Sequence, residues 1–386
     1  MTIGPVVSKA DIDVLIPVYN AASTLELALA SITAQTFRDI RIVIVDDGSE
    51  DDSPKILSAW AARDQRIEIV RRPNGGIVAA LNTGLEQCSA TYLARFDADD
   101  IAFPNRLEWQ RNYLKANRAC VGVGCAVQHI DEHGARIHGL PQPGAPGKGD
   151  PEWAPAREPY IVHPFLMARR EAVIAVGGYR FVPNSEDSDL FWRLAEVGSL
   201  HNPEEVLGQY RIHQHSLSSA SVVNGRVMAV GSQLGALSAH RRRTGQPDLR
   251  FQMQANAELR SAGTLEMMCA SAEGQLQPQE AQRFRLAVAM KLLELAAYRP
   301  FSIDHGDCAF IRRALDHAHL FSPENRNEMR WYVTETAKRL LQKGELSNAL
   351  ALTPPSFYAR TAAKALAGLL ASKPKASNAS FASPMN

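Results

Sequence analysis

Short apolar runs alternate with amphipathic segments through the first hundred residues. The apolar runs cover residues 13–20, 41–46, 66–71 and 91–96, and the amphipathic segments between them cover 24–36, 53–63 and 77–88. The run 41–46 reads RIVIVD and is apolar on both faces, which is typical of a parallel strand covered by helices on both sides. This alternation predicts a doubly wound, Rossmann-like α/β sheet.

The pattern changes after Asp100. Helical spacing predicts helices at 104–116, 167–176 and 186–196, and the run 121–130 is typical of a strand. The segment 139–159 is rich in Pro and Gly, so we expect a mobile loop there.

From about residue 223 the chain is typical of a smaller, mostly α-helical region, with helices expected at 280–298, 308–320 and 325–343. We therefore expect four parts: an N-terminal tail (1–10), an α/β domain (11–222), a helical region (223–355), and a C-terminal amphipathic helix with a disordered tail (356–386).

Composition and charge exclude several classes of protein. Apolar residues make up 45% of the 386 and charged residues 22%, which excludes global disorder. The net charge of +1 gives no general attraction for nucleic acid, which is therefore not an expected partner. The five cysteines form no CxxC pair, which favours free thiols in a reducing compartment. We find no signal peptide and no apolar stretch of ~18 residues, so the expected location is the cytoplasm.

Polar side chains follow three of the predicted strands. These clusters are Pro17-Val18-Tyr19-Asn20, Asp46-Asp47-Gly48-Ser49 and Asp97-Ala98-Asp99-Asp100. Ligands of open α/β sheets bind at the carboxyl ends of the strands, so three clusters at one edge predict a site. Taken alone, the second cluster would read as a turn with a helix cap.

Asp97, Asp99 and Asp100 place three like charges within four residues. Such crowding is costly unless a cation neutralises it, and carboxylates suit Mg²⁺ or Mn²⁺. The alternative is a solvated acidic loop. Neither a GxGxxG turn after the first strand nor a GxxxxGK[ST] loop occurs, which disfavours a dehydrogenase and a P-loop enzyme.

The segment 184–194 reads NSEDSDLFWRL and predicts a helix with Ser185 as its N-cap. Helical phase places Asp187 on the apolar face, which makes it a candidate general base. Stabilisation of the helix dipole is the alternative. Asp189 lies nearly opposite, where we expect a surface carboxylate paired with Arg193.

Two histidines remain open to two interpretations. His213, in the stretch QYRIHQHS, can complete a metal site or contact phosphate, or be an ordinary exposed side chain. His163, before Pro164, can line the acceptor side of the site or have no role there.

Seven motifs in order carry a family resemblance. They are DVLIPVYN, IVIVDDGSEDDS, RRPNGGIVAALNTGL, YLARFDADDIAFPNRLEWQ, HPFLMARREAVIAVGGY, NSEDSDLFWRL and YRIHQHSLS. Over about residues 11–219 the chain resembles a bacterial family 2 glycosyltransferase of the GT-A fold. That resemblance implies an inverting enzyme that uses a nucleotide-diphosphate sugar and a divalent metal, Mn²⁺ or Mg²⁺.

The resemblance also implies roles for individual residues. Asp187 matches the catalytic base, Asp97 and Asp99 match the DxD motif, and Arg211 and His213 match a late motif that closes over the diphosphate. Asp99 and His213 are the expected metal ligands. The expected nucleotide-sugar contacts are Pro17, Tyr19, Asn20, Asp46, Asp47, Asn82, Arg95, Asp97 and Arg211.

The expected reaction is transfer of a sugar to an acceptor hydroxyl during assembly of a surface polysaccharide, with a glycan or lipid-linked glycan as acceptor. The alternatives are an inactive nucleotide-sugar or glycan-binding module of the same fold, and metal-dependent hydrolysis of nucleotide sugars. A structural role for the helical half is compatible with transfer. The segment 357–372 has a basic amphipathic pattern, which predicts either peripheral contact with the inner membrane face or a helix packed on its neighbours.

Overall fold

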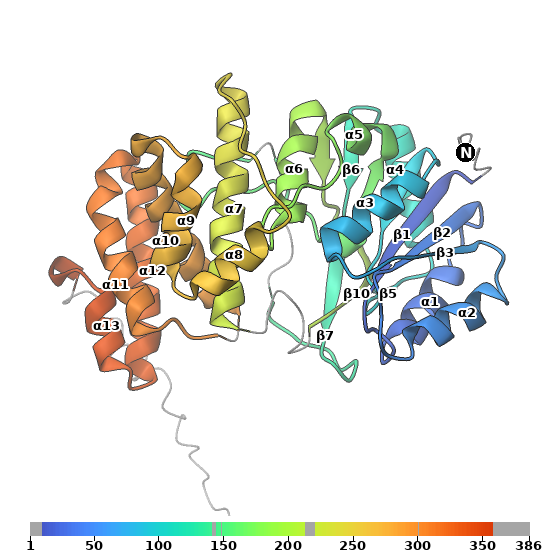
Figure 1. Cartoon of the computed structure of the whole chain (residues 1–386), viewed down its shortest axis with the longest axis horizontal. Coiled ribbons are helices and arrows are strands. Elements are labelled where there is room, and N and C mark those ends of the chain that lie inside the picture. Colours follow the sequence, from blue (N-terminus) through green and yellow to red (C-terminus); the bar gives the residue numbers. More distant parts are fainter. Residues whose placement is uncertain (1–9, 141–143, 148, 213–220, 300, 358–386) are drawn as a thin grey trace, which may run out of the picture. The chain divides into compact units, whose positions relative to one another are not determined.

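The computed structural model describes residues 10–140, 144–147, 149–212, 221–299 and 301–357 (Figure 1). The contacts between residues divide the chain into two compact units, residues 1–302 and 303–386.

The first unit contains a seven-stranded sheet with the strand order β3-β2-β1-β4-β8-β6-β9. Its strands are β1 (Ile12–Val18), β2 (Ile40–Asp46), β3 (Ile67–Arg71), β4 (Tyr92–Arg95), β6 (Cys120–Val123), β8 (Met167–Arg169) and β9 (Ser199–His201). Strands β3, β2, β1 and β4 are parallel neighbours, whereas β8 runs antiparallel to both β4 and β6. The predicted α/β sheet is confirmed as a mixed sheet with a parallel core.

Helices cover both faces of this sheet (Figure 1). Side chains of β1 alternate between the faces, with Val14 and Ile16 in one apolar cluster and Leu15 in the other. The first cluster includes α1 (Leu25–Thr33), α2 (Ser53–Ala61) and α4 (Arg106–Ala116), and the second includes α3 (Ile77–Gln87), α5 (Arg170–Ala175) and α6 (Glu186–Val197). This is the doubly wound arrangement that the alternating pattern predicts.

Two predicted elements are wrong in part. The helix expected at 167–176 begins only at Arg170, because Met167–Arg169 pairs as an inner strand of the sheet. The strand expected at 121–130 is two strands, β6 and β7 (Ala126–Ile130). Strand β7 pairs with β10 (Val206–Arg211), which also pairs with β5 (Ile101–Ala102) in a separate three-stranded sheet.

The chain after Val222 is helical, as predicted. The helices of the first unit are α7 (Val222–Arg243), α8 (Ala255–Ala262), α9 (Leu265–Ala272) and α10 (Pro278–Tyr298). Helix α7 packs against α6 on one side and α10 on the other. The compact units therefore divide at 302/303, whereas we expected a boundary at 222/223.

The second unit contains α11 (His305–Ala314), α12 (Pro323–Gln342) and α13 (Leu346–Leu352). Helix α13 packs against both others, and the buried side chains include Ile311, Val333 and Leu352. Of the segment 357–372, for which an amphipathic helix was predicted, only Phe357 lies within the described residues. Within the described ranges, no helix has the length and hydropathy needed to cross a bilayer.

Candidate active site

The carboxyl ends of β1, β2 and β4 meet at one edge of the sheet. In the parallel register, Val18 pairs with Asp46 and Leu15 pairs with Arg95. The hydroxyl group of Thr24, just before α1, donates to the carbonyl oxygen of Ala98 at 3.0 Å. The three polar clusters that follow these strands therefore lie at the same edge, as predicted.

The loops after β1 and β2 are tied together by hydrogen bonds. The Asn20 backbone N–H donates to the Ser49 hydroxyl at 3.0 Å, and the Glu50 N–H donates to the Asn20 side-chain oxygen at 2.8 Å. Asn20 adopts a left-handed backbone conformation (φ 50°) in this junction. Pro17 is buried in β1, whereas the Tyr19 ring is 52% exposed. Of these residues, Tyr19 presents a surface on which a nucleotide base can stack.

Asp46 and Asp47 bind neighbouring backbone. The Asp46 carboxylate accepts the N–H three residues further on at 3.0 Å. Asp47 is 3% exposed and accepts the Arg72 guanidinium at 2.6 Å together with the backbone N–H groups of Gly75 and Gly76. Asp47 therefore orders the loop that leads into α3.

Asp97, Asp99 and Asp100 form an acidic triad at the end of β4. One carboxylate oxygen from each lies within 4.8 Å of the others. Asp100 is 1% exposed and its Oδ1 accepts the Arg211 backbone N–H at 2.8 Å. Its Oδ2 is buried and has no hydrogen-bond partner among the residues that the structure describes. Burial, and then the charges of Asp99 and Asp97, raise the pKa of Asp100 well above its usual value. A divalent cation fits this triad, because it supplies both the missing partner and the compensating charge.

Two arginines expected to contact the nucleotide sugar hold the triad loop through hydrogen bonds. Arg95 is 2% exposed and donates to Asp97 Oδ1 at 2.5 Å and to the Phe96 carbonyl oxygen. Arg211 is 4% exposed and donates to the carbonyl oxygens of Asp99 at 2.8 Å and Asp131 at 2.9 Å. His213, the other expected metal ligand, lies outside the described residues.

Asn82 ties α3 to the segment before α6. Its Nδ2 donates to the Tyr179 carbonyl oxygen at 2.8 Å, and its Oδ1 accepts the Tyr179 N–H at 3.0 Å. The Tyr179 hydroxyl lies 2.9 Å from His163 Nε2, and burial lowers the pKa of His163 well below its usual value. Asn82 and His163 thus meet at Tyr179, and the His163 ring also packs edge-on against Phe191.

The N-terminus of α6 carries Asp187. Leu190 and Phe191 are buried on its face of the helix, as predicted, while Asp187 itself is partly exposed. Burial raises the pKa of Asp187 above its usual value. Burial and then the charge of Asp187 raise the pKa of Glu186, and the charge of Asp97 also contributes. The negative charge of Asp97 in the triad therefore acts on Glu186 at the start of α6.

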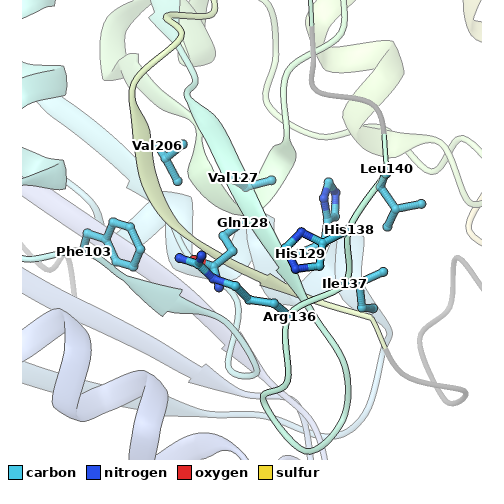
Figure 2. Close-up of a pocket in the computed structure, with 10 residues that line it drawn as sticks. Phe103, Val127, Gln128, His129, Arg136, Ile137, His138, Leu140 and Val206 are labelled. Carbon is cyan, nitrogen blue, oxygen red and sulfur yellow. The ribbon is translucent and has the colours of Figure 1, made fainter. Parts of the chain in front are cut away.

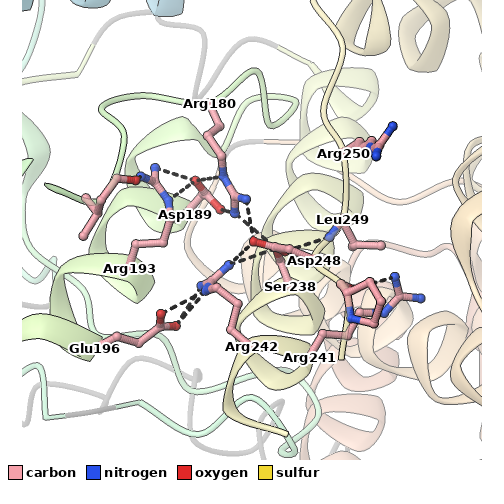
Figure 3. Close-up of polar contacts among 12 residues, drawn as sticks. Arg180, Asp189, Arg193, Glu196, Ser238, Arg241, Arg242, Asp248, Leu249 and Arg250 are labelled. Atoms are coloured by element: carbon pink, nitrogen blue, oxygen red, sulfur yellow. Dashed lines mark hydrogen bonds and ion pairs between the residues drawn. The ribbon is translucent and has the colours of Figure 1, made fainter. Parts of the chain in front are cut away.

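The expectation that Asp189 is a surface carboxylate is wrong (Figure 3). Asp189 is fully buried and forms ion pairs with Arg180 and Arg193, the second at 2.7 Å. The face opposite Asp187 is covered by α7, where a Cβ atom added at Gly235 would lie 3.7 Å from Asp189 Cβ. The predicted pairing with Arg193 is confirmed.

Comparison with known proteins decides the family. The family model described as "Glycosyl transferase family 2" matches residues 13–177. The amylovoran biosynthesis glycosyltransferase AmsE of Erwinia amylovora is 34% identical over 189 residues, which cover 48% of this chain and 70% of AmsE. The O-antigen biosynthesis glycosyltransferase WbnJ of Escherichia coli is 30% identical over 215 residues, which cover 55% of this chain and 83% of WbnJ. This chain belongs to glycosyltransferase family 2. Among solved structures, the mannosyltransferase PcManGT of Pyrobaculum calidifontis, in complex with GDP-Man and Mn²⁺, matches with a TM-score of 0.49 at 16% identity, covering 92% of this chain and 87% of that one.

The matched segment of this glycosyltransferase contains the strand-edge loops and the acidic triad. It ends before Asp187. The match to the family model therefore gives no evidence on Asp187, and any role of this residue must be argued from its contacts in the structure.

The glycosyltransferase also has a groove of about 390 Å³ against the three-stranded sheet (Figure 2). Apolar side chains, among them Phe103 and Leu140, line it together with His129, Arg136 and His138. None of the predicted site residues that the structure describes lines this groove.

Sequence reasoning missed two residues near the start of α6, Glu158 and Lys291. Asp100 belonged to the acidic cluster expected to bind a cation, although the metal ligands named individually were Asp99 and His213. Glu158 accepts the Ser188 hydroxyl group on α6, and Lys291 contacts Glu158 from α10; both residues lie outside the recognised motifs. No sequence pattern links these two residues, because Lys291 on α10 comes 133 positions after Glu158 in its loop.

Proposed function

We propose that this family 2 glycosyltransferase transfers a sugar from a nucleotide-diphosphate sugar to an acceptor hydroxyl, with inversion at the anomeric carbon. The observation that carries this proposal is the acidic triad at the strand edge, with the start of α6 within its electrostatic reach. A diphosphate needs cationic partners, which a metal ion held by the triad would supply. An attacking hydroxyl needs a base, which Asp187 at the start of α6 would supply.

The loops after β1 and β2 would hold the nucleoside. Tyr19 offers an exposed ring for stacking on the base. Asn20, Asp46 and Asp47 hold the backbone of these loops through hydrogen bonds, so they would act by shaping the nucleoside pocket.

Asp97, Asp99 and Asp100 would hold a divalent cation, Mn²⁺ or Mg²⁺, with His213 as a further candidate. When bound, the cation would act as a Lewis acid that stabilises the negative charge of the departing diphosphate. Arg95 and Arg211 would hold the triad loop in place, through the hydrogen bonds to Asp97 and to the Asp99 carbonyl oxygen.

Asp187 would act as the general base. Its raised pKa makes it a stronger base than an ordinary aspartate while leaving it ionised at neutral pH. It would take the proton from the acceptor hydroxyl as the oxygen attacks the anomeric carbon from the face opposite the diphosphate. A single displacement of this kind inverts the anomeric configuration.

The acceptor would be a growing glycan, carried on a lipid and assembled at the cytoplasmic face of the inner membrane. The relatives AmsE and WbnJ, which are named for amylovoran and O-antigen biosynthesis, support the glycan as acceptor.

The test is a thermal-shift screen of nucleotide-diphosphate sugars with Mn²⁺, followed by incorporation of the labelled sugar from the best donor into an acceptor extract. A bound donor raises the melting temperature by mass action. Incorporation supports transfer, whereas release of free sugar alone indicates hydrolysis. Donor binding with neither product indicates an inactive binding module.

A further inference from the structure

Four elements of the first unit meet at the side chain of Glu158. One carboxylate oxygen, Oε1, accepts the hydroxyl group of Ser232 on α7 at 2.6 Å and lies 2.7 Å from Nζ of Lys291 on α10. The other, Oε2, accepts the hydroxyl group of Ser188 on α6. Glu158 belongs to the segment 139–159 that the sequence predicts to be a mobile loop. One carboxylate therefore connects both α7 and α10 to Ser188 at the start of α6.

Ser188 connects this carboxylate to Asp187. The Ser188 backbone N–H donates to Asp187 Oδ1 at 2.7 Å, while the hydroxyl group of the same residue donates to Glu158. A change in the position of Glu158 therefore moves the residue that holds the Asp187 carboxylate.

The pair of Glu158 and Lys291 is nearly buried, with side chains 11% and 12% exposed. Burial acts against the ionised form of Glu158, but Lys291 and the two serine hydroxyls hold its pKa below the usual value. Lys291 also lies 2.8 Å from Glu294, one turn along α10. Glu158 is therefore a charged carboxylate in a poorly hydrated place, where its field is weakly screened.

Several ionisable groups act on Asp187. Glu186 adjoins it on α6, Glu158 faces it from the loop, Arg299 follows α10, and Tyr179 precedes the helix. Burial raises the pKa of Asp187, the Ser188 N–H lowers it, and the charge of Glu158 raises it.

We infer that Glu158 and Lys291 are positioning residues for the base: Glu158 holds Asp187 through Ser188 and strengthens it as a base, and Lys291 on α10 holds Glu158 charged and in place. This inference rests on the proposed role of Asp187. It gives the helices after Val222 a part in the reaction that the motifs of the α/β sheet do not include.

The test is a pH titration of the Asp187 carboxyl carbon by NMR in protein labelled with ¹³C at aspartate, with the signal assigned by its loss in Asp187→Asn. Glu158→Gln removes a negative charge, so the Asp187 midpoint should move to lower pH by roughly half a unit or more. Lys291 acts on Asp187 through Glu158, so Lys291→Met should shift the midpoint in the wild-type background. In the Glu158→Gln background the same substitution should shift it much less, because the charge on which Lys291 acts is gone.

The control is Lys55→Met, which removes a lysine that is 84% exposed and paired with Asp52, and should leave the midpoint unchanged. A wild-type midpoint in both single variants, or a shift caused by Lys291→Met that is equal with and without Glu158→Gln, would overturn the inference. If Lys291→Met does not fold, Glu158→Gln decides alone. This variant removes the buried carboxylate and leaves Lys291 paired with Glu294. The titration needs neither donor nor acceptor, so its failure is distinct from full turnover by Asp187→Asn, which would refute the proposed base itself.

Discussion

Asp189 and Arg193, one turn apart on α6, form a buried ion pair with 2.7 Å between Oδ2 and Nη2. Arg180 binds the other oxygen of the same carboxylate and also pairs with Asp248 at 2.9 Å (Figure 3). Asp189, two residues after the proposed base, thus links α6 to Arg180, which precedes the helix, and through Arg180 to Asp248, which follows it. The role of Asp189 is structural.

Replacement of this carboxylate should destabilise the protein strongly. Asp189→Asn leaves the buried Arg193 without its counter-charge and leaves Arg180 paired with Asp248 alone. Removing one partner of a buried ion pair typically costs about 3–5 kcal/mol in the free energy of unfolding. Asp52→Asn is the matched control, since it removes an exposed pair with Lys55 and should cost less than about 1 kcal/mol. Urea unfolding of both variants measures the difference, and equal free energies would contradict the buried network.

Substitution by alanine should have opposite effects at two glycines of α7, Gly231 and Gly235. A Cβ atom at Gly231 would lie 1.9 Å from the Pro183 carbonyl oxygen, whereas one at Gly235 would lie 3.7 Å from its nearest neighbour, in Asp189. Gly231→Ala should therefore lower the melting temperature and the turnover, because α7 must move away from the loop that precedes α6. Gly235→Ala should be neutral or stabilising by up to ~1 kcal/mol, the usual gain from alanine inside a helix. The reverse order of melting temperatures would refute the close approach of α7.

Removal of divalent metal should abolish transfer. Excess EDTA should stop turnover, and Mn²⁺ or Mg²⁺ should restore it, because the crowded carboxylates of the triad need a cation to bind a diphosphate. Asp99→Asn should weaken Mn²⁺ binding measured by calorimetry, with Asp52→Asn as the control of equal charge change. Full turnover in excess chelator would exclude a metal from the reaction.

The rate should depend on ionisation of Asp187. Its pKa is raised to about 6, and only the deprotonated carboxylate can accept a proton. At saturating acceptor and donor, turnover should therefore be constant above pH ~7 and fall about tenfold for each unit below pH ~6. An acid limb near pH 4, the value of an ordinary aspartate, would argue against this environment for the base.

Much of the α/β sheet could be predicted from the sequence, because its parallel strands are short apolar runs that end in polar turns. Both faces of β2 are buried, which is what the run RIVIVD indicates. Met167–Arg169 could not be predicted, since a three-residue strand that precedes a helix has no periodicity of its own. Its pairing with β4 and β6 is a tertiary contact.

The site was predictable where chemistry follows a strand, and less so where a second layer of structure covers it. Helical phase placed Asp187 and Asp189 on opposite faces of α6 but could not show that α7 buries the face that carries Asp189. For the same reason Glu158 had no signal in the sequence, because its partners come from α6, α7 and α10.

The most direct test of the proposed mechanism compares donor affinity and transfer rate in Asp187→Asn. The substitution keeps the shape of the side chain and removes its basicity. We predict that turnover falls by roughly 10²–10⁴-fold, as expected for a lost general base, while the dissociation constant of the nucleotide-diphosphate sugar stays within about threefold of the wild-type value. Wild-type turnover by Asp187→Asn would contradict the account.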